Sequence, residues 1–171
     1  APLWMRHSVI SPDGTTIAFT YKGDIYTVPV AGGRAMQITT NPAYDTAPVW
    51  SPDSKRIAFA SDRMGSLDVY IVAKDGGEPR RLTTHSGSET PLAFTDAGHV
   101  LFSAGIMPSA EAVVFPSNGQ FNQVYRVSVE GGRPTMISSM PMECISINKE
   151  GAMLYQDKKG YEDYWRKHHV S

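Results

Sequence analysis

The sequence contains a single cysteine, no long apolar segment and almost no net charge. Cys144 cannot form a disulfide within the chain, so the redox compartment stays open. A formal net charge of −1 gives no reason to expect nucleic acid or a membrane surface as a partner. No apolar run reaches the length of a membrane-spanning helix. We therefore expect a globular chain with no nucleic acid partner and no membrane insertion.

The common catalytic and ligand-binding motifs are also missing. The chain has no Gly-x-Ser-x-Gly elbow, no His-Glu-x-x-His, no Cys-x-x-Cys and no phosphate-binding glycine loop. We expect no catalytic residue, no metal and no cofactor in this chain. Three weaker candidates each have a structural alternative. His168-His169 could bind a metal, but neighbours on a strand point to opposite faces.

The other two candidates are an acidic hairpin and the lone thiol. Asp62, Ser66 and Asp68 could form a calcium loop, although bonding to their own backbone amides is favoured. Cys144 could be a nucleophile, but its place beside Ile145 in an expected inner strand favours a buried, inert thiol. None of the three predicts catalysis.

What the sequence does contain is a repeat of about forty to fifty residues. Ser11-Pro12-Asp13-Gly14 recurs as Ser51-Pro52-Asp53-Ser54, and weaker copies begin at Thr95 and Asn148. Proline at the second position presets φ, and Asp and Gly accept the conformations that reverse the chain, so the phrase predicts a turn. An apolar triplet follows each turn: Ile17-Ala18-Phe19, Ile57-Ala58-Phe59, Val100-Leu101-Phe102 and Met153-Leu154-Tyr155.

Two further segments complete each repeat. A second strand ends in an aromatic residue at Tyr26, Tyr70, Tyr125 and Trp165, and a Gly-Gly pair then precedes a short closing strand in the first three repeats. Four strands per repeat, with 15 glycines and 12 prolines in the turns between them, are typical of β-propeller blades. We predict an all-β propeller of four-stranded antiparallel blades over residues 1–171. The expected blades are about 3–39, 44–83, 90–138 and, in part, 143–171.

The repeat resembles that of a known family. Ser-Pro-Asp-Gly, the apolar triplet, Asp24-Ile25-Tyr26, Gly-Gly and Leu82-Thr83 are similar to the propeller repeat of TolB and the tricorn-type serine peptidases. The excursion from Gly105 to Asn122 and the segment from Lys159 to His169 resemble the first, six-bladed tricorn propeller. The resemblance implies a propeller that binds or guides peptides for catalytic domains elsewhere in a larger peptidase. This chain itself is not expected to be an enzyme.

The resemblance also implies where a ligand would bind. Paired arginines anchor the peptide carboxylate in the archaeal form, but the comparable loop here, residues 86–90, has none, so that role is not carried over. Arg80-Arg81 lies on the expected outermost strand, where a solvated edge is favoured. If the family geometry holds, one mouth of the channel is lined by Tyr44, Asp45, Ser88, Glu89 and Glu143, and these are the candidate binding residues.

Three complete blades and a partial fourth are too few to close a ring. Each open end would expose apolar surface, and about 400 Å² costs about 10 kcal/mol at about 25 cal/mol per Å². We therefore expect further blades of a parent chain or a second copy of this chain to complete the ring. The apolar excursion from Gly105 to Asn122 is either a lid or subunit contact, or packs over a neighbouring blade or domain.

The alternative function is a TolB-like module for protein interactions in the bacterial envelope. A third class, an enzyme acting alone within the channel, has no motif in its favour. The relationship to exported bacterial proteins favours a periplasmic or otherwise exported location, with the cytoplasm as the alternative.

Overall fold

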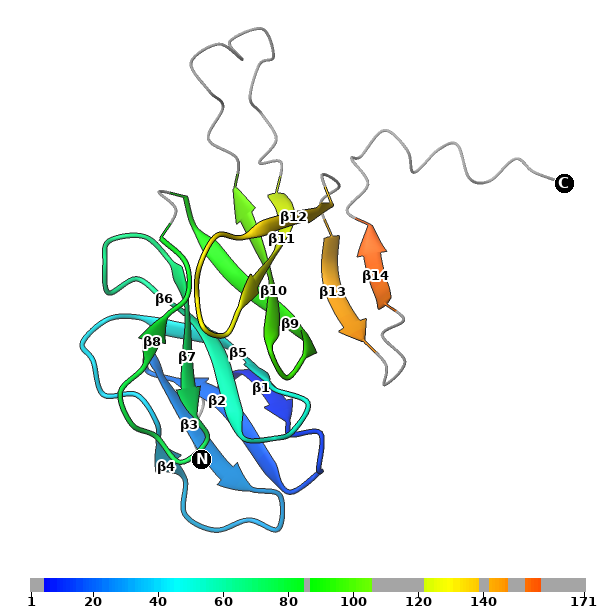
Figure 1. Ribbon diagram of the computed structural model, residues 1–171. Helices are drawn as coiled ribbons and strands as arrows, with labels where there is room; N and C mark the ends of the chain where they lie inside the picture. Colours follow the sequence, from blue (N-terminus) through cyan, green and yellow to red (C-terminus); the bar gives the residue numbers. More distant parts are fainter. Residues whose placement is uncertain (1–4, 85–86, 106–121, 139–141, 148–152, 158–171) are drawn as a thin grey trace, which may run out of the picture.

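The computed structural model describes residues 5–84, 87–105, 122–138, 142–147 and 153–157. These residues form fourteen β-strands and no helix. The strands make three four-stranded antiparallel sheets and one antiparallel pair (Figure 1). The predicted all-β fold, with three complete blades and a partial fourth, is confirmed. The fourth repeat shows only its first two strands because residues 158–171 lie outside the described part.

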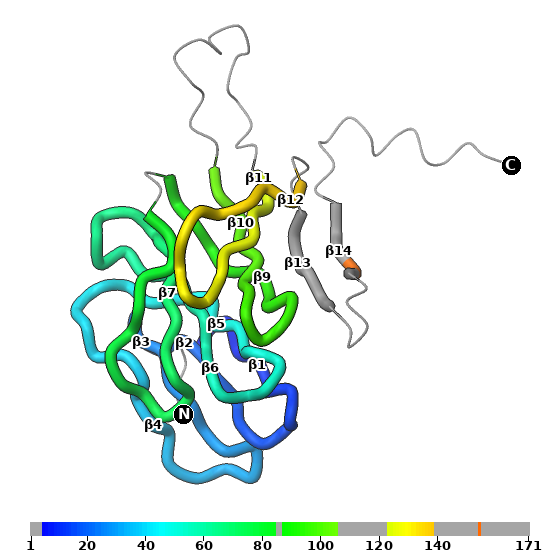
Figure 2. Tube along the Cα trace, viewed as in Figure 1, coloured from blue at the N-terminus to red at the C-terminus, as the bar shows by residue number. Residues whose placement is uncertain are grey.

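Each blade is a meander, since its strands follow one another in chain order across the sheet. The Cα trace passes through the first three blades in succession (Figure 2). The strands of the four blades have the following bounds: β1 (Arg6–Ile10), β2 (Thr16–Tyr21), β3 (Asp24–Pro29) and β4 (Met36–Gln37); β5 (Asp45–Trp50), β6 (Arg56–Ser61), β7 (Asp68–Ala73) and β8 (Arg80–Arg81); β9 (Glu89–Asp96), β10 (His99–Gly105), β11 (Asn122–Ser128) and β12 (Thr135–Ser138); β13 (Met142–Ile147) and β14 (Met153–Asp157).

The first strand of each blade lies on the inside of an arc. β5 contacts β1 on one side and β9 on the other, and β9 also contacts β13 (Figure 1). The short strands β4, β8 and β12 lie at the opposite edges of their sheets. This is the radial arrangement of a propeller, and the arc formed by the described blades does not close.

The repeated Ser-Pro-Asp phrase forms the turn that the sequence predicts. Ser11 Oγ donates to Asp13 Oδ1 at 2.6 Å, and the same oxygen accepts the Thr15 amide at 3.0 Å. The second blade repeats this turn with Ser51 and Asp53, whose Oγ and Oδ1 atoms are 2.6 Å apart. These hydrogen bonds stabilise the charged aspartates, so the serine hydroxyl in each turn lowers the pKa of Asp13 and of Asp53.

Apolar side chains fill the spaces between neighbouring blades. One cluster joins the first two blades and includes Ile25, Trp50 and Phe59, while a second joins the next two and includes Val69 and Phe102. Ala18, Ala58 and Ala60 are fully buried, as expected for small residues that let the sheets approach closely. Aromatic pairs recur on equivalent strands, with ring centroids 5.8 Å apart for Phe19–Tyr26 and 5.9 Å apart for Phe59–Tyr70.

Threonine hydroxyls complete the outer edges of two blades. The Ile25 amide donates to Thr39 Oγ1 at 3.0 Å, and the Val69 amide donates to Thr83 Oγ1 at 2.9 Å. Both hydroxyl groups replace a main-chain acceptor just where the two-residue outer strand ends. The closing Ile-Thr and Leu-Thr pairs of the sequence therefore have a defined structural role.

Several sequence-based expectations fall outside the described residues. They concern His168-His169 and most of the excursion between Gly105 and Asn122. The backbone of Cys144 lies in β13, but its side chain is outside the described part.

Candidate functional site

One end of the arc brings together the first residues of the inner strands. We define the inner-strand mouth as Arg6, Tyr44-Asp45, Ser88-Glu89 and Glu143, together with the β2–β3 and β6–β7 turns. Each blade is joined here to the one before it. The Asp45 amide donates to the Gly23 carbonyl at 2.7 Å, and the Glu89 amide donates to the Leu67 carbonyl at 2.7 Å.

The β2–β3 turn has the tight form that the sequence predicts. Tyr21 and Asp24 pair directly, and only Lys22 and Gly23 connect them. Both have positive φ, 52° and 88°, which is characteristic of a type I′ hairpin. A Cβ atom on Gly23 would lie 3.4 Å from Cδ2 of Tyr44, so glycine also leaves space for that ring.

Asp45 lies at the mouth but is fully buried and bound to an arginine. Arg63 Nη2 lies 3.2 Å from Asp45 Oδ1 and 3.1 Å from Oδ2. Arg63 Nε also donates to Ser61 at 2.9 Å, and the guanidinium carbon lies 4.5 Å from the centroid of the Tyr70 ring. These contacts fix the β6–β7 loop against the inner strand. Ligand binding by Asp45 stays a prediction, and its observed contacts are structural.

The other predicted residues differ in exposure. Glu89 is buried at the start of β9, whereas Ser88 is exposed and its carbonyl accepts the Gly105 amide at 3.4 Å. Glu143 pairs with Gln156 across the β13–β14 ladder, and its side chain lies outside the described residues. Binding roles for these three residues also stay predictions.

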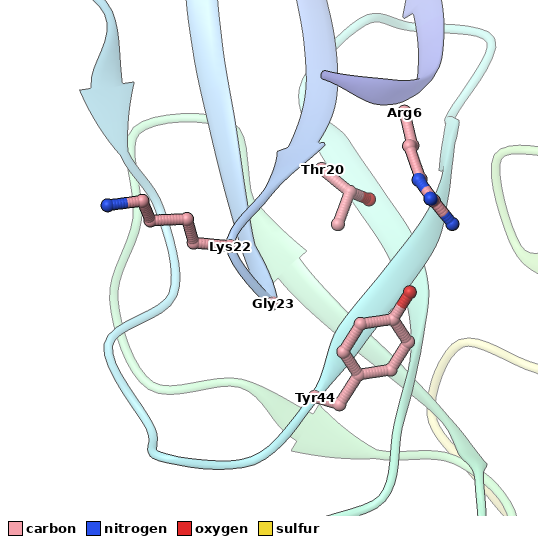
Figure 3. Close-up of a pocket in the computed structure, with 5 residues that line it drawn as sticks. All are labelled: Arg6, Thr20, Lys22, Gly23 and Tyr44. Carbon is pink, nitrogen blue, oxygen red and sulfur yellow. The ribbon is translucent and has the colours of Figure 1, made fainter. Parts of the chain in front are cut away.

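Tyr44 is the predicted residue that borders a hollow. Its side chain is 45% exposed, and with Arg6, Thr20, Lys22 and Gly23 it lines a space of about 330 Å³. Figure 3 shows the Arg6 guanidinium, the Thr20 hydroxyl and the Tyr44 hydroxyl around the same space, while Lys22 extends away. The Tyr44 backbone is held by Asp62, whose Oδ1 accepts its amide at 2.8 Å.

The sequence reasoning missed Arg6, Thr20 and Arg63. Arg6 and Thr20 belong to strands of the first blade, and no motif marks either residue. For Arg63, the wider hairpin of the second repeat was the available signal, because the extra residues must be held in place. Side-chain direction at a strand end decides which polar residues meet, and the repeat pattern does not specify it.

The acidic hairpin and the paired arginines have partners within the protein. Asp68 Oδ2 lies 2.9 Å from Arg81 Nη2, and Asp68 is fully buried. Arg80 Nη1 lies 2.9 Å from Glu130 Oε2 on the next blade. The expectation of a solvated edge at Arg80-Arg81 is therefore wrong, because both arginines pair with carboxylates. Within the described residues, no three His, Cys, Asp or Glu side chains gather as a metal site.

Burial shapes the charge near the mouth. It raises the pKa of Asp24, and the nearby negative charge of Asp45 raises it further, while a hydrogen bond from Gln37 opposes both effects. Gln37 Nε2 donates to Asp24 Oδ2 at 3.1 Å. The described part of the chain has no helix long and apolar enough to cross a bilayer.

The fold and the repeated turns define a β-propeller, and comparison with known proteins identifies the family. Residues 2–170 match the family described as the tricorn protease N-terminal beta propeller domain. The chain belongs to this family. It is 35% identical over 102 residues to tricorn protease homolog 1 of Streptomyces coelicolor, covering 59% of this chain and 9% of that protein.

Two TolB proteins are also similar. The Tol-Pal system protein TolB of Bordetella pertussis is 44% identical over 55 residues, covering 32% of this chain and 13% of that protein. The crystal structure of TolB from Acinetobacter baumannii superposes with a TM-score of 0.67 at 19% identity. That alignment covers 92% of this chain and 39% of the solved one, and it shows the fold alone. The chain thus spans a small part of the curated relatives it matches.

Proposed function

We propose that this chain is the non-catalytic propeller portion of a tricorn-type serine peptidase, in which it binds or guides peptides and contacts other domains. The observation that carries the proposal is the family match over residues 2–170, combined with coverage of only 9% of the Streptomyces relative. The inner-strand mouth supports it further, because binding residues of propellers are commonly carried by the loops at strand ends.

Site-specific cross-linking in the whole protein that contains this chain tests the proposal. A photoreactive amino acid replaces Tyr44 or Ser88 at the mouth, or Met136 on the outer strand β12 as a control; Met136 is 53% exposed. Irradiation with a mixture of short peptides should label the two mouth positions more than the control position. Equal labelling at all three positions would mean that peptides do not gather at this mouth.

The proposal includes closure of the ring by further blades or by a second copy. The second blade shows what a covered face looks like, because Ile57, Phe59, Tyr70 and Val72 pack against the first blade. Their exposed fractions are 0%, 0%, 4% and 3%. The equivalent residues of the first blade face away from the second blade. Three of these four side chains, Ile17, Tyr26 and Val28, are only half-buried.

An additional hollow lies on the same side of the first blade. Tyr26 lines it with Arg34, Ala35, Met36 and Gln37, and its volume is about 560 Å³. Half-buried aromatic and aliphatic side chains at positions that are covered in the next repeat indicate a face built for a neighbour. This supports a closed ring in the working protein.

The alternative function is a TolB-like module for protein interactions. The 44% identity to Bordetella TolB over 55 residues favours it. The same cross-linking experiment separates the two, since this module would capture folded envelope proteins rather than short peptides. An exported location is proposed with either function, and an intracellular one is the alternative for the peptidase. Cell fractionation of the producing organism distinguishes them.

A further inference from the structure

The hollow beside Tyr44 has the dimensions and the polar groups of a small ligand site. Its volume of about 330 Å³ lies at the lower end of the range for small-molecule pockets, about 300 to 1,000 Å³. Arg6 comes from β1 and Thr20 from β2, whereas Tyr44 comes from the connection into the second blade. The site therefore forms only where two blades meet.

Thr20 supplies a buried donor with no observed partner. The residue is 3% exposed, and among the described residues nothing forms a hydrogen bond with its Oγ1 atom. A buried hydroxyl without a partner is unfavourable. Figure 3 shows this hydroxyl directed toward the space between Arg6 and Tyr44. A ligand atom that accepts a hydrogen bond in that space would satisfy it.

Arg6 supplies a positive charge that no carboxylate balances in the described part of the protein. The four ion pairs found there involve other side chains. The nearby Asp45 is bound by Arg63, and the Lys22 ammonium lies 5.5 Å from the centroid of the Tyr21 ring, away from the hollow. The site thus offers one guanidinium and two hydroxyl groups.

We propose that this hollow binds a carboxylate of a peptide, either an Asp or Glu side chain or the free C-terminus. A carboxylate matches one guanidinium in charge and geometry, and its remaining lone pairs can accept the Thr20 and Tyr44 hydroxyl groups. The Tyr44 ring offers an apolar wall for the methylene groups of an acidic side chain. This inference rests on the proposed peptide-binding function and names the ligand chemistry for one part of the mouth.

The test uses the whole protein that contains this chain and three labelled peptides. The first has acetylated and amidated ends and one central Glu, the second has Gln in its place, and the third is the Gln peptide with a free C-terminus. Fluorescence anisotropy measures their affinities. A hydrogen-bonded charge pair predicts at least about tenfold tighter binding of the Glu peptide, the free-C-terminus peptide, or both, relative to the blocked Gln peptide. The peptide that binds more tightly identifies the source of the carboxylate.

Variants connect the preference to these residues. Arg6→Gln should abolish the preference and Arg6→Lys should retain part of it, because lysine keeps the charge but not the planar fork. Arg133→Gln is the matched control, an equal loss of charge at an exposed site in the third blade. Thr20→Val should weaken binding about threefold to tenfold without lowering the melting temperature, because it removes a buried hydroxyl that has no observed partner.

The outcomes separate this inference from the proposed function. Equal binding of all three peptides, or an equal loss of affinity in Arg6→Gln and Arg133→Gln, would overturn the carboxylate site and leave peptide binding intact. If no peptide binds, the proposed function fails. The site is then decided by NMR titration with N-acetylglutamate α-amide against N-acetylglutamine α-amide. Shifts at Thr20 and Tyr44 specific to the glutamate compound would support the site, and their absence would overturn it.

Discussion

Ile17 and Ile57 occupy the same position in the first two blades and provide a direct test of ring closure. Ile57 is fully buried between blades, whereas Ile17 is half-buried on the open face of the first blade. Replacing a buried isoleucine with alanine removes contacts and leaves a cavity, which costs about 2–5 kcal/mol. If another blade covers Ile17 in the whole protein, Ile17→Ala should cost about as much as Ile57→Ala. An uncovered Ile17 should cost about 1 kcal/mol or less, as surface substitutions do.

Native-state hydrogen exchange in the whole protein measures both costs without requiring that all its domains unfold together. Mass spectrometry of peptides spanning residues 16–29 and 56–73 reports the local opening free energy of each blade. Similar losses for the two variants would support a covered first blade. An Ile17→Ala loss below about 0.5 kcal/mol, beside an Ile57→Ala loss above about 2 kcal/mol, would refute the reasoning.

Three further predictions concern individual residues. The pKa of Asp53 is lowered in the folded state, so its contribution to stability is present above the unfolded value near 4 and disappears as the pH falls through the folded value. Denaturation between pH 6 and pH 2 should show a smaller loss of stability in Asp53→Asn than in the parent, and an identical slope would contradict this. Arg63→Gln leaves the buried Asp45 carboxylate unpaired and should cost about 3–5 kcal/mol in denaturant unfolding, while the double variant with Asp45→Asn should recover part of that loss. Thr83→Val removes the acceptor of the Val69 amide and should cost about 1–3 kcal/mol, with faster exchange at that amide than in the parent.

The fold was predictable from the sequence because the repeat encodes local chemistry. The Ser-Pro-Asp turns form through hydrogen bonds between residues that are near neighbours in the chain, such as Ser51 with Asp53. The apolar triplets alternate between the two faces of a sheet, and Ala58 and Phe59 indeed face different neighbouring blades. Such short-range rules survive variation in the other residues of a repeat.

The candidate site was less predictable because it depends on contacts between repeats. The sequence placed Tyr44 and Asp45 at one mouth but did not show that Asp45 is buried under Arg63. It also gave no sign that Arg6 and Thr20 meet Tyr44, since these residues come from different strands and a connecting loop. Contacts of this kind follow from how adjacent sheets are rotated, which no single repeat determines.

The hydrogen bonds from Asp45 to Gly23 and from Glu89 to Leu67 join each blade to the hairpin of its predecessor. During synthesis a new blade therefore meets an attachment point that has already been made, and assembly can proceed from the N-terminus one blade at a time. Because every junction uses main-chain atoms, it depends little on the side chains of the two blades. Duplication or loss of a whole repeat would preserve the same joint, so gene rearrangement can change the number of blades without redesigning the contacts between them.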